Sequence, residues 1–201
     1  MNVAITFTNY SHRDLYLRNL LKQLKKATLN PVIFDSAVNE TVLSFQKYRV
    51  VREKKKTLFE NIHSAFLFLA DQEGKCLYLQ EDCQLCKSFR KRLNKIKVDG
   101  STLYLLYSTS RNNNIPIGNF YGEVALLAND SFFKLYRSFW EGKTITHKTK
   151  HDLGLRRFLK TNKISIVNII PNLVQHIGTH SAKKRKYCSL DSMLRSPTFK
   201  S

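Results

Sequence analysis

Hydrophobic and polar positions alternate along the chain in two different periods, which predict strands and helices in turn. An apolar, β-branched run at residues 3–8 predicts a strand. Residues 14–26 carry leucines spaced three and four positions apart with lysines on the opposite face, which predicts an amphipathic helix. A second short strand is expected at residues 31–34. These three segments form a strand–helix–strand unit of the length that a parallel crossover needs.

The same alternation continues to the end of the chain. Further helices are expected at residues 57–70, 131–141 and 152–160, and further strands at residues 76–79, 103–107, 124–128 and 164–169. The strongly basic run 47–56 is expected in a loop or at a helix start. This order predicts a single α/β domain over residues 1–181 with a mostly parallel, mixed central sheet flanked by helices, followed by a basic C-terminal tail at residues 182–201.

Composition narrows the class of protein. The chain has 201 residues, 42% of them hydrophobic, which is enough for one domain with a core. Its apolar stretches are far shorter than the roughly 20 residues that a membrane span needs. The first residues lack the basic and then apolar pattern of a signal peptide, so we expect a cytoplasmic protein without a membrane span.

The charge balance is the unusual feature of the composition. There are 34 Lys and Arg against 15 Asp and Glu, a net charge of +19. Such an excess favours a polyanionic partner: nucleic acid, an anionic membrane surface or a phosphorylated substrate. A solvated basic surface without a partner is the alternative.

The cysteines offer a weaker hint of chemistry. Cys83 and Cys86 have the spacing of a metal or redox pair, but a zinc site needs a second pair, and only Cys188 and scattered histidines remain. We therefore favour reduced thiols, half-buried at the end of a strand.

Polar side chains follow three of the expected strands. Ligands of parallel sheets bind beyond the carboxyl ends of the strands, which selects Thr8 and Asn9, then Asp35, then Glu81 and Asp82. Adjacent acids at such a place suit Mg²⁺ or Mn²⁺ bound together with substrate phosphates. A solvated turn at the end of the strand is equally compatible with the two acids.

Several segments resemble the nucleotide-sugar half of GT-A glycosyltransferases. The resemblance lies in residues 5–13, in the helix from residue 57, and in Leu-Tyr-Leu-Gln-Glu-Asp at residues 77–82. Its most specific part is Leu-Val-Gln-His-x-Gly within residues 170–181, which is similar to a late segment of that family. Residues 151–160 are similar to the stretch that carries the catalytic base of inverting members.

The resemblance implies a GT-A-like fold with a metal and a nucleotide-sugar donor. Asp82 and His176 would be ligands of Mn²⁺ or Mg²⁺, and an imidazole ligand favours manganese. His176 could instead be a hydrogen-bonded structural histidine, and His180 is a weaker second candidate. The acidic motif departs from Asp-x-Asp, because Cys83 follows Asp82. If Cys83 took the place of the last aspartate, the ligand would be lost; we favour the register that keeps Asp82.

The resemblance also implies residues that bind the donor. Thr8, Asn9 and Arg13 would hold the nucleotide and its phosphates, Asp35 the base or ribose, and Glu81 the sugar or ribose. For two of them a plainer role is open, because Arg13 could be solvated on the first helix and Asp35 could form a turn.

Asp152 is the candidate general base. In an inverting transfer it would take the proton of the acceptor hydroxyl. An N-cap of the helix that starts there is the competing role, and both can coexist because a helix start favours an ionised carboxylate.

Clusters of basic residues suggest the acceptor. A nucleotide-sugar carries about two negative charges, whereas each phosphate of a nucleic acid adds affinity through counterion release. We expect DNA to meet two basic clusters: Lys87, Arg90, Lys91 and Arg92, and Lys183, Lys184, Arg185 and Lys186.

The expected function is thus transfer of a sugar from a UDP-sugar to a hydroxymethylated pyrimidine in DNA, a modification that bacteriophages use. Two alternatives stay open. One is a glycosyltransferase with a glycan, lipid-linked or protein acceptor, and the other is a non-catalytic nucleic-acid-binding α/β protein.

Overall fold

The protein is described here by a computed structural model. It covers residues 1–8, 13–36, 47–52, 57–120, 124–143, 151–177 and 196–199, and at residues 151 and 152 it describes the backbone alone. In this part of the chain, no helix is long and apolar enough to cross a bilayer.

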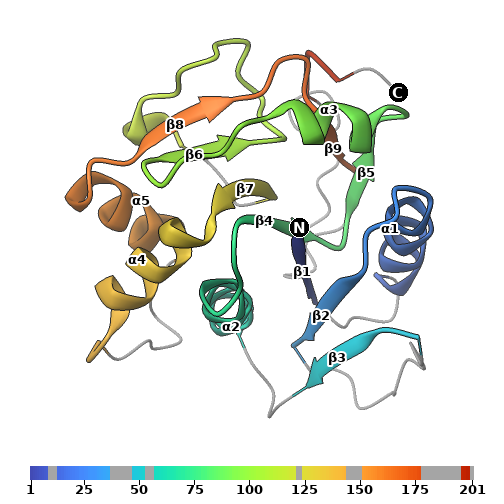
Figure 1. Cartoon of the computed structure of the whole chain (residues 1–201), viewed down its shortest axis with the longest axis horizontal. Coiled ribbons are helices and arrows are strands. Elements are labelled where there is room, and N and C mark those ends of the chain that lie inside the picture. Colours follow the sequence, from blue (N-terminus) through green and yellow to red (C-terminus); the bar gives the residue numbers. More distant parts are fainter. Residues whose placement is uncertain are drawn as a thin grey trace.

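Two sheets form the framework of the molecule (Figure 1). The large sheet holds β1 (Asn2–Phe7), β2 (Pro31–Asp35), β3 (Arg49–Arg52), β4 (Lys75–Gln80), β6 (Thr102–Leu105), β7 (Ala125–Asn129) and β8 (Ser165–Asn168), in the order β3-β2-β1-β4-β7-β6-β8. Only β7 runs antiparallel to its neighbours. A small antiparallel sheet pairs β5 (Cys83–Leu85) with β9 (Val174–His176). The expected α/β fold with a mostly parallel, mixed sheet is confirmed.

Helices cover both faces of the large sheet. One face carries α2 (Leu58–Ala70), α4 (Asp130–Trp140) and α5 (His151–Thr161), and the other carries α1 (Asp14–Lys26), α3 (Phe89–Lys95) and the small sheet. A short 3₁₀ turn, η1 (Ile117–Asn119), contacts α5. Each face has its own apolar core, and burial of these side chains is the main force that holds the three layers together.

The strand order creates a switch point beside the first strand. From β1 the chain moves outward to β2 and β3, and it then returns to place β4 on the other side of β1. In open α/β sheets the crevice at such a point, beyond the carboxyl ends of the strands, is where ligands bind. The topology therefore directs attention to the ends of β1 and β4.

A buried amide fixes the carboxyl ends of β1 and β2. Asn61 lies on α2, and its side-chain nitrogen donates to the carbonyl oxygens of Phe34 at 2.9 Å and Phe7 at 3.4 Å. The helix that carries it begins with a capping box, in which the Thr57 hydroxyl accepts from the Glu60 amide and the Glu60 carboxylate accepts from the Thr57 amide. The start of α2 is thereby tied to the edge of the sheet where the site forms.

Part of the basic run at residues 47–56 differs from expectation, and its residues 53–56 lie outside the described residues. Residues Arg49–Arg52 form the edge strand β3, which pairs in parallel with β2, rather than a loop or a helix start. Val50 and Val51 are β-branched residues, which suit a strand, and charged side chains are tolerated at the edge of a sheet. The short elements α3, β5 and β9 were not expected either, because three to seven residues are too few to show a clear hydrophobic period.

We expect Asn61→Ala to lower the free energy of unfolding by about 1–3 kcal/mol, because two buried carbonyl oxygens lose a donor. Urea denaturation measures the change. Asn19→Ala, at an exposed position on α1, is the matched control and should stay within about 0.5 kcal/mol. Equal losses in both variants would contradict the role given to the Asn61 amide.

Candidate active site

Two adjacent carboxylates are buried directly after β4. Glu81 and Asp82 are each 2% exposed. They are not the solvated turn that their sequence also allowed. Burying two charges without partners would cost several kcal/mol, so the surrounding groups must compensate them.

Arg13 supplies this compensation from the residue that precedes α1. Its Nε lies 2.6 Å from Oε1 of Glu81, and its Nη2 lies 2.6 Å from Oδ2 of Asp82. The backbone amide of Thr8, just beyond β1, also donates to Oε1 of Glu81 at 3.1 Å. Arg13 is itself only 6% exposed, so it serves as a counter-ion within the protein rather than as a solvated surface residue.

His176 reaches the same place from the end of β9. Cys83 and His176 are partners in the small sheet, and this pairing sets Nε2 of His176 3.0 Å from Oδ2 of Asp82. The amide of Ile177 donates to the Asp82 carbonyl at 2.9 Å. The ring of Tyr107 lies against the imidazole, with 5.9 Å between the centroids. Two residues that are 94 positions apart in sequence thus meet at the switch point.

A network of buried amides holds the segment that leads to His176. The side-chain nitrogen of Asn172 donates to Oδ1 of Asn168 at 2.7 Å and to the carbonyl of Ile169 at 2.8 Å. Ser196, from much later in the chain, donates its hydroxyl to Oδ1 of Asn172 and its amide to Oε1 of Gln175. Part of the segment expected as a basic tail is therefore packed against the domain, beside the site.

The charges in this cluster alter one another. Burial raises the pKa of Glu81 to about 7, although Arg13 opposes the shift. Burial also acts to raise the pKa of Asp82, but His176 and Arg13 outweigh it and hold that pKa below its usual range. Burial acts to lower the pKa of His176, and the Asp82 carboxylate reverses the effect, so that the pKa is raised. Asp82 is thus the carboxylate that stays ionised.

The chemistry of this cluster fits a divalent cation that is completed by a substrate. Oδ1 of Asp82 is buried and has no hydrogen-bond partner within the described residues, and an imidazole lies beside the carboxylate. In the same part of the chain, no group of three or more His, Cys, Asp and Glu could hold a metal by itself. Two protein ligands plus substrate phosphates and water make an ordinary Mg²⁺ or Mn²⁺ site.

Cys83 packs in the apolar core beside this cluster. Its thiol is fully buried in the apolar core and donates to the Val124 carbonyl at 3.4 Å, and burial raises its pKa well above the usual range. A protonated, core-facing thiol does not ligate a metal well. The geometry therefore favours the register with Asp82, and Cys83 and Cys86 are buried free thiols.

Two other candidate residues have partners outside this cluster. Asp35, at the end of β2, forms an ion pair with Arg52 at 2.8 Å. Arg92 is turned inward and donates to the Pro171 carbonyl. The positions that lie outside the described residues are Asn9, His180, Lys183, Lys184, Arg185, Lys186 and the side chain of Asp152.

Two residues of the site were not expected from the sequence. Tyr107 follows a strand in an apolar run and carries no signal of its own there. Asn61 was detectable in principle, because it is a polar residue on the apolar face of a predicted helix.

We expect Arg13→Met to lower the free energy of unfolding by about 3–5 kcal/mol, because two buried carboxylates lose their cation. Urea denaturation at neutral pH checks this value. Adding Glu81→Gln should recover part of the loss, since one of the buried charges is then absent. Arg18→Met removes an exposed ion pair on the same helix and should cost no more than about 0.5 kcal/mol. A similar small loss in both variants would refute the role of Arg13.

Comparison with known proteins identifies the fold. No protein-family model matches the chain, and no curated protein matches it significantly. Among solved structures, Drosophila β1,4-galactosyltransferase 7 in complex with manganese, UDP-Gal and xylobiose has a TM-score of 0.53 at 10% identity, over 92% of this chain and 74% of that one. Galactosyltransferase LgtC, with donor and acceptor sugar analogues, has a TM-score of 0.50 at 12% identity, over 85% and 73%.

A nucleotidyl transferase from Methanothermobacter is similar to the same degree, with a TM-score of 0.53 at 13% identity over 84% of this chain and 85% of that one. Identities this low establish the fold and no more. The chain has the α/β fold of GT-A glycosyltransferases, which nucleotidyltransferases share.

Proposed function

We propose that the protein is a metal-dependent glycosyltransferase. It would move a sugar from a nucleotide-sugar, with UDP-glucose as the first candidate donor, to the hydroxyl of a hydroxymethylated pyrimidine in DNA. The proposal rests on one observation: Nε2 of His176 lies 3.0 Å from Oδ2 of Asp82, at the switch point of this fold.

The sequence that follows β1 favours sugar transfer over nucleotidyl transfer. Loops that wrap around the phosphates of a nucleoside triphosphate are usually rich in glycine, because only glycine lets the backbone approach so closely. Residues 8–13 contain no glycine. A diphosphate held by a cation bound to Asp82 and His176 needs no such loop.

The mechanism is electrostatic, with no covalent nucleophile. A bound Mn²⁺ or Mg²⁺ would supply neutralisation of the diphosphate as it leaves. Arg13 keeps Asp82 and Glu81 in place, and the Thr8 amide fixes Glu81 against the end of β1. Thr8, Asn9 and Asp35 would bind the nucleotide, and Glu81 the sugar or ribose. Asp152, at the start of α5, would take the proton of the acceptor hydroxyl, so the transfer inverts the anomeric centre.

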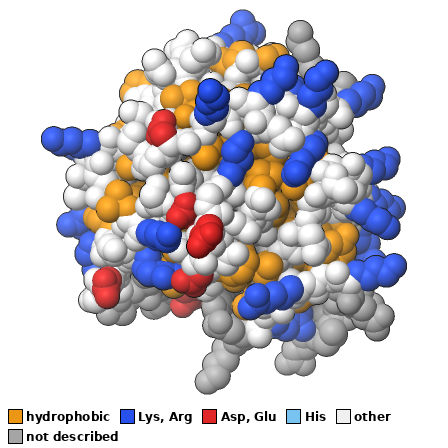
Figure 2. Space-filling view, in the orientation of Figure 1, with side chains coloured by type: hydrophobic (Ala, Val, Ile, Leu, Met, Phe, Trp, Pro, Cys, Tyr) orange, Lys and Arg blue, Asp and Glu red, His pale blue; other side chains and the backbone are white. Residues whose placement is uncertain are grey.

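The surface charge supports a nucleic acid as acceptor. In Figure 2, Lys and Arg side chains predominate over the side of the molecule that carries α1 and α3, whereas the visible Asp and Glu side chains lie on the other side. A donor with about two negative charges leaves most of a net charge of +19 unused. Transfer to a base would require flipping it out of the duplex into the site.

We expect sugar transfer from UDP-glucose to DNA that contains hydroxymethylcytosine or hydroxymethyluracil, and mass analysis of the nucleosides detects it. Chelation of divalent cations should abolish transfer, and Mn²⁺ should restore it. Asp82→Asn should lower turnover at least about 100-fold, because the metal loses its carboxylate ligand.

Three results would contradict this proposal. Transfer to glycans, lipid-linked sugars or proteins but never to DNA would reject the acceptor. Release of pyrophosphate from a nucleoside triphosphate and a sugar phosphate would make the protein a nucleotidyltransferase. Full activity of Asp82→Asn would show that the metal is held elsewhere.

Asp152→Asn should separate binding from chemistry. Asp152 is the second residue of α5 rather than its N-cap. An asparagine keeps the size of the side chain but cannot accept the proton, so transfer should fall about 100- to 10,000-fold. Donor affinity, measured by calorimetry, should stay near that of the wild type. Asp14→Asn, at the start of α1, is the matched control and should leave transfer unchanged. A loss of donor affinity in place of turnover would exclude Asp152 as the base.

A further inference from the structure

Two hollows flank the last turn of α1. The first, about 350 Å³, lies between α1 and α3 and is lined by Lys26, Lys87 and Arg90. The second, about 420 Å³, lies between α1 and the start of β3 and is lined by Lys25, Lys47 and Tyr48. We call them the α1–α3 hollow and the α1–β3 hollow. Lys25 lines one hollow and Lys26 lines the other, so the two hollows lie on either side of the same helical turn.

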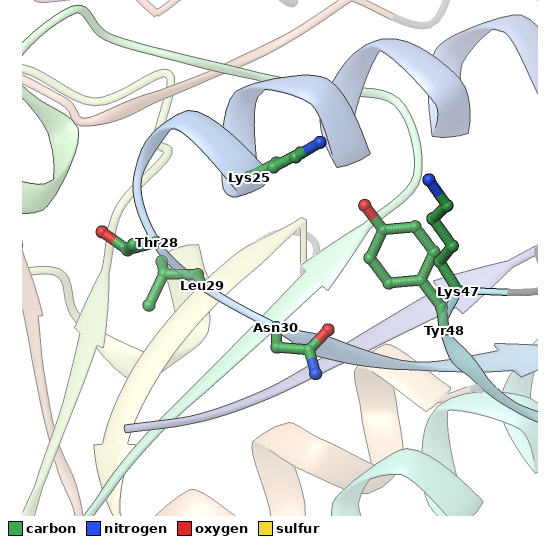
Figure 3. Close-up of a pocket in the computed structure, with 6 residues that line it drawn as sticks. All are labelled: Lys25, Thr28, Leu29, Asn30, Lys47 and Tyr48. Atoms are coloured by element: carbon green, nitrogen blue, oxygen red, sulfur yellow. The ribbon is translucent and has the colours of Figure 1, made fainter.

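All the charged side chains that line the two hollows are cationic. No Asp or Glu is among the described residues that line them. Figure 3 shows the ammonium groups of Lys25 and Lys47 on either side of the Tyr48 hydroxyl in the α1–β3 hollow. Arg90 lines the α1–α3 hollow, and its Nη1 atom is buried and has no hydrogen-bond partner in the described part of the chain. A buried guanidinium nitrogen without a partner is costly unless an anion satisfies it.

A second cation near Arg90 also favours an anionic ligand. Lys75 lies nearby and donates to the carbonyls of Leu93 and Ile96 at the end of α3. Burial, and then the charge of Arg90, lower the pKa of Lys75. Arg90 thus faces another cation, which leaves local positive charge for a ligand to neutralise.

Stabilisation of the helix end does not explain this arrangement. Lysines in the last turn of a helix interact favourably with the helix dipole, and this accounts for Lys25 and Lys26. Lys47, Lys87 and Arg90 come from other segments of the chain and converge on the same turn. Their convergence requires an explanation beyond α1 itself.

We propose that the two hollows bind phosphate groups of one nucleic-acid strand, which crosses the last turn of α1. The inference deepens the proposed function, on which it rests for its biological meaning, by naming the surface that holds the acceptor. Five cations then meet the strand, and the ring of Tyr48 offers a face on which a base can stack.

The position of the α1–α3 hollow suits an acceptor. Leu85 lines this hollow and lies on β5, two residues after Cys83, the sheet partner of His176. Two residues of an extended strand span roughly 7 Å. The hollow lies at the last turn of α1, about 20 Å along the helix from Arg13, so a bound nucleic acid that extends along α1 reaches the metal-binding pair.

An anionic membrane fits this surface less well. Binding to a membrane surface uses apolar side chains that insert beside the basic ones. None of the large exposed hydrophobic residues of the described chain lines either hollow; they are Met1, Leu15, Val50, Leu58, Leu135 and Leu153. Cations set in hollows also suit a phosphodiester that enters them better than a flat layer of headgroups.

Binding of a labelled DNA duplex, and of one of its strands, tests the proposal by fluorescence anisotropy between about 50 and 200 mM salt. For the double variant Lys26→Gln, Lys87→Gln we expect roughly tenfold weaker binding at low salt and a salt slope that is shallower by about two counterions. The control is Arg157→Gln, Lys160→Gln, which removes the same charge from exposed positions on α5 and should change binding by less than about threefold.

The outcomes separate this inference from the proposed function. Equal losses in the two double variants, or no binding of nucleic acid by the wild type, would overturn it. Preference for phosphatidylserine vesicles over DNA would overturn it too. Hydrolysis of UDP-glucose without an acceptor should be unchanged in Lys26→Gln, Lys87→Gln. If the wild type binds DNA through the hollows but turns over no donor, the inference survives and the transferase assignment fails.

Discussion

The site depends on one buried guanidinium. Arg13 sits between two consecutive carboxylates that the end of a central strand carries into the interior. Two buried anions side by side would repel each other and favour protonation, and the cation offsets both effects. The same ion pairs join the start of α1 to the end of β4, so the first crossover of the fold is anchored where the strand order reverses.

Most of the large sheet and its covering helices could be predicted from the hydrophobic pattern. The helix at residues 14–26 matches α1 in both bounds, because its leucines share one face and its neighbours are lysines. The central strand β4 is recognisable because its four inner residues, 76–79, are all apolar, as expected for a strand that is buried on both faces. The pattern failed where elements are short or charged, since β3 has two arginines in four residues and α3 has only Phe89 and Leu93 to bury.

The position of the candidate site could be predicted from the sequence, but the contacts between its residues could not. Strand ends and the Leu-Val-Gln-His string pointed to Asp82 and His176, and the structure brings these two side chains together. Arg13 was expected at a phosphate, and its pairing with Glu81 and Asp82, a contact across 68 residues, is one that no local pattern encodes. The same holds for Tyr107, whose place beside His176 follows only from how the two sheets meet.

The packing of Ser196 and Thr198 on Asn172 affects when the site takes shape. Asn172 and Gln175, which position the end of β9, acquire their full set of partners only from polypeptide made more than twenty residues later. On the ribosome, the first strands and their crossover can pair early, whereas Asn172 and Gln175 gain these partners only after residue 198 has emerged. A nascent chain would therefore hold its buried acids and arginine in place before the segment that carries His176 acquires its last partners.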